Sequence, residues 1–277
     1  MNVASASLPA RSVRGALSFA SVAGRTHLMG QHTPHPFHIT RPFRHPFDPQ
    51  GMVTLYLQSS SGGIYGDDDL ALSVDVQPGA AVHLTTQAST VVHDARSRPG
   101  ACQTVTLNVG QGALLEYLPD PAILMAGARL TTRIRAHLAE GATVLLADAQ
   151  LCHDPDGTGR PFEALDCEIA VSDAAGETPL FLDRFTLHGA DWLTRTGGYR
   201  CAGTVLLAGD TSAGGAMLEA AESLPAVYAG LSTLTDRKIS VLRFLAEDGV
   251  ALSRALKTIW SATREALTGT TPAARRK

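Results

Sequence analysis

The sequence predicts a mainly β protein, a helical or solenoid-like β-structure of stacked short strands, with about two α-helices near its C-terminus. Segments in which apolar and polar residues alternate recur along most of the chain, which is the period-2 pattern of strands with one buried face. Glycine-containing turns separate these segments at intervals of about thirty residues, as in stacked coils. After Gly203 the pattern changes to one typical of amphipathic helices.

The alternating segments locate the expected strands. The first clear one follows a glycine-rich turn at Ser61–Gly66, and a threonine-rich run at 82–90 favours extended backbone because its residues are β-branched. The apolar positions that alternate are Leu70, Leu72, Val74 and Val76; Val105, Leu107 and Val109; Leu130, Ile134 and Leu138; and Leu165, Cys167, Ile169 and Val171.

Three similar turns connect these strands to the apolar runs that follow them. They read Gln77-Pro78-Gly79-Ala80, Gly110-Gln111-Gly112-Ala113 and Ala139-Glu140-Gly141-Ala142. The first suits a type II turn, in which proline sets the first φ and glycine takes the positive one. Their regular recurrence is the main support for the solenoid-like prediction.

Two helices are expected in the C-terminal part. Thr211-Ser212 is a candidate cap for an alanine-rich helix that ends near Leu224, and Asp248 for a second helix. The second helix would place Leu252, Leu256, Ile259, Trp260, Thr263 and Leu267 on one face. We therefore expect a single domain over 1–277, β-rich over 15–205 and helical over 206–270, with a flexible tail at 271–277.

Composition favours a cytoplasmic globular protein. The chain has 277 residues, 44% of them hydrophobic, and a formal net charge of -3, so no basic face suggests nucleic acid, and the terminal Arg275–Lys277 reads as a solvated tail. Pro9, Arg11 and Arg14 interrupt the N-terminal segment before a signal-peptide core can form, and no apolar run reaches membrane-spanning length. Its widely spaced cysteines, Cys102, Cys152, Cys167 and Cys201, read as reduced core thiols.

Several residue clusters invite a chemical interpretation. Imidazole is a good nickel ligand, so the histidines of one proline-containing segment are either metal ligands or ordinary loop residues. They are His27, His32, His35, His38 and His45. Asp67-Asp68-Asp69 is either a divalent cation site or a solvated turn with Asp68 directed inward.

Three other patterns predict no site. Residues 154–157 lack the remaining positions of a calcium loop and read as a turn. Cys152 and His153 are adjacent, so on a strand they point to opposite faces and do not form a nucleophile–base pair. The glycines at 62–66 are followed by a strand and not by Gly-Lys-Ser/Thr, which excludes a phosphate loop.

Three co-ordered motifs resemble the urease accessory protein family called UreD, or UreH in some organisms. They are Gly62-Gly63-Ile64-Tyr65-Gly66-Asp67-Asp68-Asp69-Leu70, Leu84-Thr85-Thr86-Gln87-Ala88-Ser89-Thr90-Val91 and Leu118-Pro119-Asp120-Pro121-Ala122-Ile123-Leu124-Met125-Ala126-Gly127-Ala128-Arg129. Weaker similarity covers roughly residues 15–200 and the helix around Trp260. The chain departs from the family at Asp67, where the family has glycine, and at Val91, where it has lysine. Where the family has Trp-Glu and Glu-Arg, this chain has Ala147-Asp148 and Asp183-Arg184. Each aspartate keeps the acidic group of the family glutamate on a side chain one methylene shorter.

The resemblance implies a scaffold without catalytic residues or a tightly bound cofactor. It implies contacts with the urease apoprotein and a UreF-like helical accessory protein, onto which a UreG-like GTPase docks, and it allows a dimer of heteromers. It further suggests that nickel passes transiently through the interior, where carboxylates would offset its desolvation and still release it. By family position these are Asp68, Asp148 and Asp183.

The family motifs also assign supporting roles. Thr85 and Thr86 are expected to line or support the passage, and the remaining motif residues to serve the structure: Gly62, Gly63, Gly66, Gln87, Gly127 and Arg129. The alternative is that the three aspartates and two threonines only complete buried hydrogen bonds. Two other classes of protein stay open. One is an interaction module without metal traffic. The other is a β-solenoid enzyme acting on polysaccharide, which the low aromatic content of 5% disfavours because such enzymes display aromatic residues along an open groove.

Overall fold

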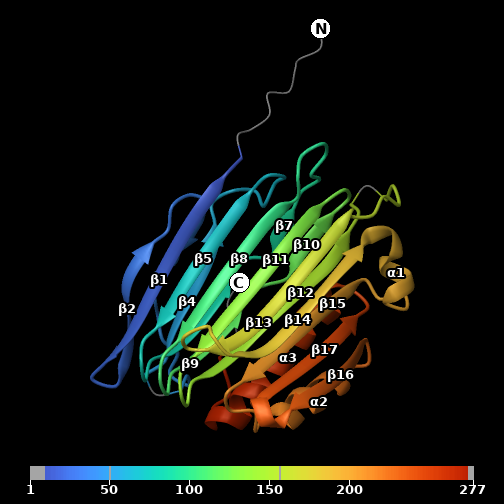
Figure 1. Ribbon diagram of the computed structural model, residues 1–277. Coiled ribbons are helices and arrows are strands. Elements are labelled where there is room, and N and C mark those ends of the chain that lie inside the picture. The colour runs from blue at the N-terminus through green and yellow to red at the C-terminus, as the bar shows by residue number, and fades with distance from the viewer. Residues whose placement is uncertain (1–9, 50, 156, 274–277) are drawn as a thin grey trace.

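Two β-sheets pack face to face in the computed structural model, which describes residues 10–49, 51–155 and 157–273 (Figure 1). The seven-stranded sheet runs in the order β14 (Pro179–His188), β13 (Ala164–Asp173), β11 (Arg129–Leu138), β8 (Ala101–Val109), β5 (Asp69–Val76), β1 (Ser12–Val22) and β2 (Arg25–His32). The ten-stranded sheet runs β16 (Val227–Leu234), β17 (Ile239–Ala246), β15 (Cys201–Ala208), β12 (Thr143–His153), β9 (Leu114–Leu118), β6 (Ala81–Thr86), β4 (Val53–Ser59) and β3 (Phe37–Ile39), and includes β7 (Thr90–Val92) and β10 (Ala122–Met125).

The chain passes from one sheet to the other at the three predicted turns. Strand β5 leads into β6, β8 into β9, and β11 into β12, and strands of successive coils pair in parallel. The glycines Gly79, Gly112 and Gly141 have φ values of 66°, 62° and 69°. The Gly79 N–H donates to the Gln111 carbonyl at 2.9 Å, which joins one turn to the next. These contacts confirm the solenoid-like prediction.

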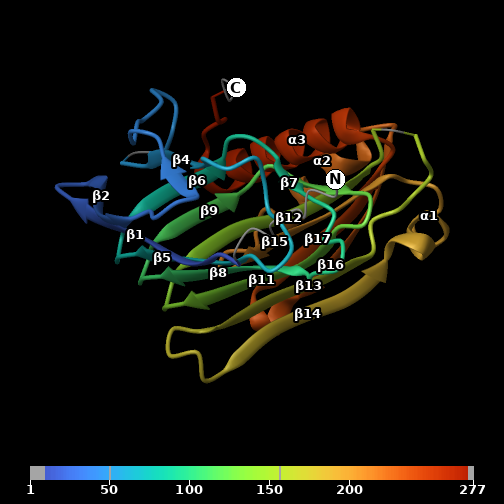
Figure 2. The ribbon, with the colours of Figure 1, turned by 90° about the horizontal axis from the view of Figure 1, so that it is seen from above.

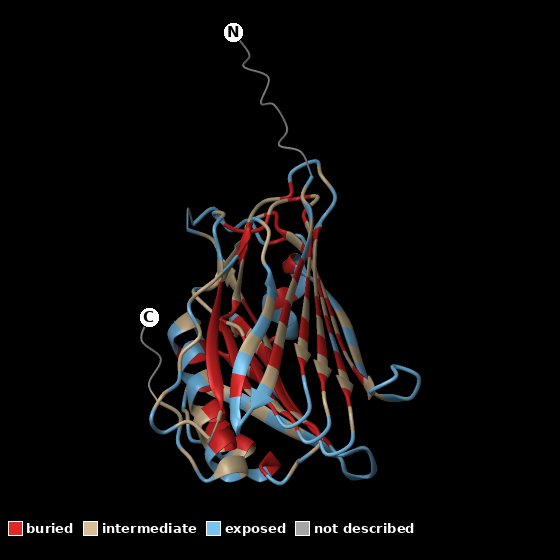
Figure 3. Ribbon diagram, turned by 90° about the vertical axis from the view of Figure 1, so that its left-hand side faces the viewer, coloured by how far each residue is buried: buried red, intermediate tan, exposed pale blue. Residues whose placement is uncertain are grey.

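The main core lies between the two sheets. On the seven-stranded sheet, Leu72 pairs with Val105, Val105 with Ile134, and Ile134 with Ile169, so one apolar ladder crosses four parallel strands. Each of these side chains is at most 5% exposed. Figure 3 shows the buried residues as stripes between the sheets. Because side chains alternate along every strand, the same pattern that predicts the strands also selects the buried face.

A second core lies between the ten-stranded sheet and two helices, α2 (Gly214–Glu222) and α3 (Gly249–Thr268). Figure 2 shows these helices on one side of the molecule, while the outer face of the seven-stranded sheet carries no helix. Leu242 and Phe244 of β17 face Leu252 and Ile259 of α3 in this core. A third helix, α1 (Trp192–Arg195), is a single turn beside the 3-10 turn Gly189–Asp191, and a second 3-10 turn spans Thr235–Arg237.

The predicted second helix is confirmed in its cap and its buried face. The Asp248 carboxylate accepts a hydrogen bond from the Ala251 N–H at 2.8 Å, and Gly269 ends the helix with a φ of 70°. The predicted cap of the first helix is wrong. Helix α2 begins after Ala213 without a side-chain cap, because Asp210 instead binds the Ser212 N–H and closes a turn ahead of the helix.

The C-terminal part contains two strands that the sequence analysis did not foresee. Strands β16 and β17 lie between the two helices within 206–270. Strand β16 is an edge strand that alternates between half-buried and exposed residues and has no fully buried residue, so its sequence lacks an apolar face to predict it. Of the predicted tail 271–277, residues 274–277 lie outside the described residues. No helix within the described part of the chain is long and apolar enough to cross a membrane.

Candidate functional site

Three segments that are far apart in sequence meet at one end of the sandwich, and they are the three motifs described above. The Ile64 N–H donates to the Val91 carbonyl at 2.8 Å, and the His93 N–H donates to the Ile64 carbonyl at 2.9 Å. Strand β7 of the second motif pairs in parallel with β10 of the third, with Ala122 opposite Thr90. We call this assembly of residues 62–70, 84–95 and 118–129 the motif layer.

Close contacts explain three of the glycines of the motif layer. Gly63 has a φ of 137°, and a Cβ there would lie 2.3 Å from the Val91 carbonyl oxygen. A Cβ at Gly66 would lie 3.0 Å from the Pro99 carbonyl oxygen, and one at Gly127 would lie 2.4 Å from the Asp94 carboxylate, whereas one at Gly62 would meet only the Tyr65 hydroxyl at 3.1 Å. Asp67, at the position of a family glycine, has a φ of 69°, a conformation that aspartate tolerates better than most residues. The substitution therefore keeps the backbone of the turn.

Asp68 is directed inward, as predicted. Its side chain is 3% exposed and forms a two-pronged ion pair with the Arg11 guanidinium, in which the Nε–Oδ1 distance is 2.7 Å. It also accepts a hydrogen bond from the Tyr65 N–H at 2.8 Å. The family lysine, a possible ion-pair partner for Asp68, is replaced by Val91 in this chain. Arg11 supplies the positive charge instead. These contacts are those of a structural ion pair that closes the glycine-rich turn.

Thr85, Thr86 and Gln87 join neighbouring coils. The Thr85 hydroxyl donates to the Leu118 carbonyl at 2.6 Å, and the Thr86 hydroxyl accepts from the Asp120 N–H at 2.7 Å. The Gln87 side chain accepts from Gln58 at 2.9 Å. Their hydrogen bonds tie the second motif to the third and to β4.

Arg129 holds the end of the third motif. Its guanidinium pairs with the Glu163 carboxylate at 2.5 Å and donates to the Arg98 carbonyl at 3.3 Å. The motif layer is thus fastened by side chains as well as by strand pairing.

A small pocket lies between the sheets beneath the motif layer, with a volume of about 50 Å³. Its lining is mixed, with hydroxyl, amide and carboxyl groups among aliphatic side chains, and includes Thr86, Gln103, Tyr117, Asp120 and Asp148. A larger pocket of about 270 Å³ opens beside it at Gly62, Gly63 and Gln87, and Thr86 and Gln103 line both. The two pockets therefore share part of their lining at the motif layer.

Asp148 lines this interior pocket from β12. Its carboxyl group lies at the pocket wall and accepts a hydrogen bond from the Thr132 hydroxyl at 3.2 Å. Burial raises the pKa of Asp148 to about 6, although that hydrogen bond opposes the rise. Burial, and then the nearby Asp148 carboxyl group, raise the pKa of Tyr117, so the Tyr117 hydroxyl stays protonated. Asp148 is therefore a half-buried residue on the pocket wall whose carboxyl pKa is raised well above its usual range.

Asp183 lies on β14, away from this pocket. Its Oδ2 is 2.7 Å from the Arg243 Nη2 on β17, without the alignment of a hydrogen bond. Because β14 and β17 belong to different sheets, the ion pair bridges the sandwich at its edge. The structure thus places the three aspartates separately: Asp148 lines the pocket, and Asp68 and Asp183 pair with arginines.

The histidine-rich segment is spread over β2, β3 and their connecting loops. Within residues 10–49, 51–155 and 157–273, no three His, Cys, Asp or Glu side chains lie close enough together to hold a metal ion. His35 instead bonds to the Ser60 hydroxyl at 3.0 Å.

The structure also places the four cysteines and the turn at 154–157. All four cysteines are free thiols; Cys167 and Cys201 are buried, and Cys102 and Cys152 are half-buried. Burial raises the pKa of Cys152 to about 12, so this thiol is not a poised nucleophile. Asp154 binds the Gly159 N–H at 2.7 Å within a turn, and Asp156 lies outside the described residues.

Sequence reasoning missed a buried charged cluster between the ten-stranded sheet and α3. Glu116 accepts hydrogen bonds from the Arg264 Nε at 2.8 Å, from His83 at 2.7 Å and from the Trp260 indole at 2.9 Å, and Arg264 also reaches Asp48 at 2.8 Å. The Glu116 and Arg264 residues are each 1% exposed. A single glutamate inside the apolar strand Leu114–Leu118 was the available signal, because a buried charge requires a partner.

The coils, the motif layer and the interior pocket define a β-solenoid-like sandwich that is held together by contacts between successive coils. The chain belongs to the UreD urease accessory protein family, whose sequence profile matches residues 12–277. It is 39% identical over 274 residues to urease accessory protein UreD 1 of Methylorubrum populi, covering 96% of this chain and 92% of that protein. It is 36% identical to UreD 1 of Pseudomonas syringae pv. syringae over the full length of both chains, and 35% identical to UreD 1 of a Bradyrhizobium strain, covering 96% and 95%.

Proposed function

We propose that this chain is a scaffold in the maturation of urease and that it helps deliver nickel to the urease apoprotein. In this proposal it contacts the apoprotein and a UreF-like helical accessory protein, a UreG-like GTPase docks onto the latter, and the assembly allows a dimer of heteromers. It acts in the cytoplasm, binds no cofactor tightly and catalyses no reaction of its own. Nickel is its transient cargo. Membership of the UreD family supports the role in urease maturation.

The observation that carries the nickel proposal is the position of Asp148 in the pocket beneath the motif layer. A cation entering the interior loses hydration, and a carboxylate offsets part of that cost. The pKa of about 6 means that protons compete with the metal near neutral pH, which favours weak binding and release. The hydroxyl group of Thr86 and the amide group of Gln103, which line both pockets, offer further neutral oxygen ligands.

Asp68 and Asp183 also remain in the nickel proposal, but their contacts rank them behind Asp148. Each is held by an arginine, whose positive charge opposes the approach of Ni²⁺. A metal role for either would require the ion pair to open.

The experiment is co-expression of this chain with the urease apoprotein and the other accessory proteins, with co-purification and nickel-dependent urease activity as readouts. Asp148→Asn keeps the shape of the side chain and removes its charge, and Asp166→Asn on the outward face of β13 is the matched control. We expect activation to require the chain, and Asp148→Asn to lower activation at limiting nickel while the complex still forms. Loss of the complex in that variant would indicate a structural role for Asp148.

A second function, an interaction scaffold without metal traffic, is favoured by the arginine pairing of Asp68 and Asp183. Under that alternative, all three Asp→Asn variants that still assemble would activate urease as well as the unchanged chain at every nickel concentration. That result would refute the nickel passage and leave the maturation role intact.

A further inference from the structure

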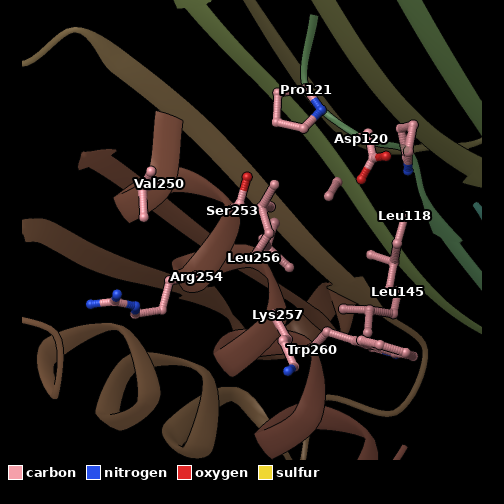
Figure 4. Close-up of a pocket in the computed structure, with 13 residues that line it drawn as sticks. Leu118, Asp120, Pro121, Leu145, Val250, Ser253, Arg254, Leu256, Lys257 and Trp260 are labelled. Atoms are coloured by element: carbon pink, nitrogen blue, oxygen red, sulfur yellow. The ribbon is translucent and has the colours of Figure 1, made fainter. Parts of the chain in front are cut away.

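A groove of about 420 Å³ lies on the outer side of the ten-stranded sheet, between that sheet and α3. Its walls are mainly apolar: Leu118, Leu145 and Val205 from the sheet and Leu256 and Trp260 from the helix. Figure 4 shows the α3 side chains along one side and Leu118, Asp120 and Pro121 on the other. A preformed apolar recess of this kind at the surface indicates a binding site for a partner.

The buried charged cluster holds the back wall of this groove in place. The Trp260 indole donates to Glu116 at 2.9 Å, and its ring stacks on His83 with the centroids 4.6 Å apart. The Arg264 guanidinium lies 4.8 Å from the same ring, on α3 itself. A ring fixed by three contacts loses little further freedom when a ligand packs against it, so the groove is organised before it is occupied.

Two cations lie at the rim of the groove. Arg254 and Lys257 are exposed on α3, and within the described part of the chain neither forms an ion pair or a hydrogen bond to a side chain. Among the described residues that line the groove, Asp120 is the one carboxylate, and it is 9% exposed. In Figure 4 the charged ends of Arg254 and Lys257 point away from it. The rim is therefore positive although the whole chain has a formal net charge of -3.

We propose that this groove is the docking site for an acidic segment of a partner protein that inserts an apolar side chain beside Trp260. The apolar walls select the inserted side chain, and Arg254 and Lys257 select the carboxylates next to it. Val250, which is 67% exposed at the mouth, extends the apolar contact. This inference rests on the proposed function only for the expectation that the partner is another component of the urease maturation complex.

Two variants test the groove without disturbing the core. Arg254→Glu with Lys257→Glu reverses the rim charge, and Val250→Asp places an acid at the mouth. Position 250 lies in the first turn of α3, where a negative charge favours the helix, so the second variant is expected to fold. The matched control is Arg25→Glu with Arg184→Glu, which makes the same charge change on exposed positions of β2 and β14.

Binding is measured separately with the purified urease apoprotein, the UreF-like protein and the GTPase, at two salt concentrations, after thermal unfolding has shown that each variant is folded. We expect one of the three partners to lose at least about tenfold in affinity for both groove variants and to retain affinity for the control. The rim variant turns two attractions into repulsions, and Val250→Asp puts a negative charge where an apolar contact is expected. The salt dependence of that partner should be smaller for the rim variant than for the unchanged chain.

The outcomes separate the two proposals. If the unchanged chain binds its partners and supports activation, but both groove variants bind all three within twofold, the groove inference is overturned and the proposed function stands. If the unchanged chain binds none of the three partners and urease activation does not depend on the chain, the proposed function is overturned, whatever the groove variants do. Equal losses in the groove variants and the control would show a general charge effect and would also overturn the groove inference.

Discussion

Replacing Arg264 by methionine is the most informative test of how the fold is held together. Arg264 carries the positive charge that reaches two buried carboxylates, Glu116 and Asp48, and it also covers the Trp260 ring. Methionine has a similar length and no charge, so the variant keeps much of the packing volume and leaves the two carboxylates without their cation. Helix α3 would lose its main polar attachment to the ten-stranded sheet.

Two independent arguments give the expected magnitude. Removing one partner of a buried ion pair typically costs about 3–5 kcal/mol, because the remaining charge is left without compensation. Burial alone would raise the pKa of Glu116, but hydrogen bonds from Arg264 and then from His83 lower it from 4.5 to about 2. At 1.36 kcal/mol per pKa unit, this depression corresponds to roughly 3 kcal/mol of stability above the unfolded pKa. We therefore expect Arg264→Met to lower the free energy of unfolding by about 3–5 kcal/mol at pH 7.

The pH dependence has a definite sign. A carboxyl group with a lowered folded pKa stabilises the protein fully above its unfolded pKa of 4.5, and this contribution is lost as the pH falls toward about 2. In the Arg264→Met variant the lowering is weaker. The difference in stability between the two proteins should therefore be largest above pH 4.5 and should narrow as the solution becomes more acidic.

Urea unfolding followed by circular dichroism at neutral pH and near pH 3.5 measures both effects. Adding Glu116→Gln to Arg264→Met removes one stranded charge and should recover part of the loss. A stability loss below about 1 kcal/mol at pH 7, or a loss that does not change between the two pH values, would refute the reasoning.

Three further predictions follow from single contacts. Asp148→Asn should raise the free energy of unfolding by up to about 3 kcal/mol at pH 7 and give little gain near pH 3.5, because burial raises the pKa of Asp148 from 3.8 to about 6. The cost of this raised pKa grows as the pH rises from 3.8 to about 6 and is complete above pH 6. Equal gains at both pH values in urea unfolding would contradict this. Asp248→Ala should cost about 1 kcal/mol through loss of the helix cap, and Asp248→Asn much less, so equal losses in urea unfolding would argue against the cap. Gly63→Ala should lower the thermal midpoint far more than Gly62→Ala, since its Cβ would lie 2.3 Å from a carbonyl oxygen and that of Gly62 meets only the Tyr65 hydroxyl at 3.1 Å; equal midpoints would mean that the turn can shift.

The repeated turns show why much of the fold could be predicted. A positive φ at Gly79, Gly112 and Gly141 is a local requirement, and an alternating strand beside each turn states which face is buried. The failed cap at Thr211-Ser212 shows the limit of such local signals. Asp210 accepts a hydrogen bond from the Ser212 N–H in a turn ahead of the helix, and Ala213 is the residue that precedes the first helical turn.

The candidate site was only partly open to sequence reasoning. The motifs located Asp68 and its inward direction, and family position located Asp148, but neither could show that Arg11 neutralises the first while the second lines a pocket. Arg11 is 57 residues from Asp68 in the chain, so no spacing rule connects them.

By itself, the sequence determined the coils, the buried faces, the capped final helix and the family, because each depends on neighbouring residues or on motifs in a set order. Only the tertiary structure decided that Glu116 meets His83 from the next coil and Arg264, 148 residues away, on α3. The reason is that these contacts depend on the register between strands and on the position of α3 against the sheet. A shift of one residue in strand register would move the Glu116 side chain to the opposite face of the sheet.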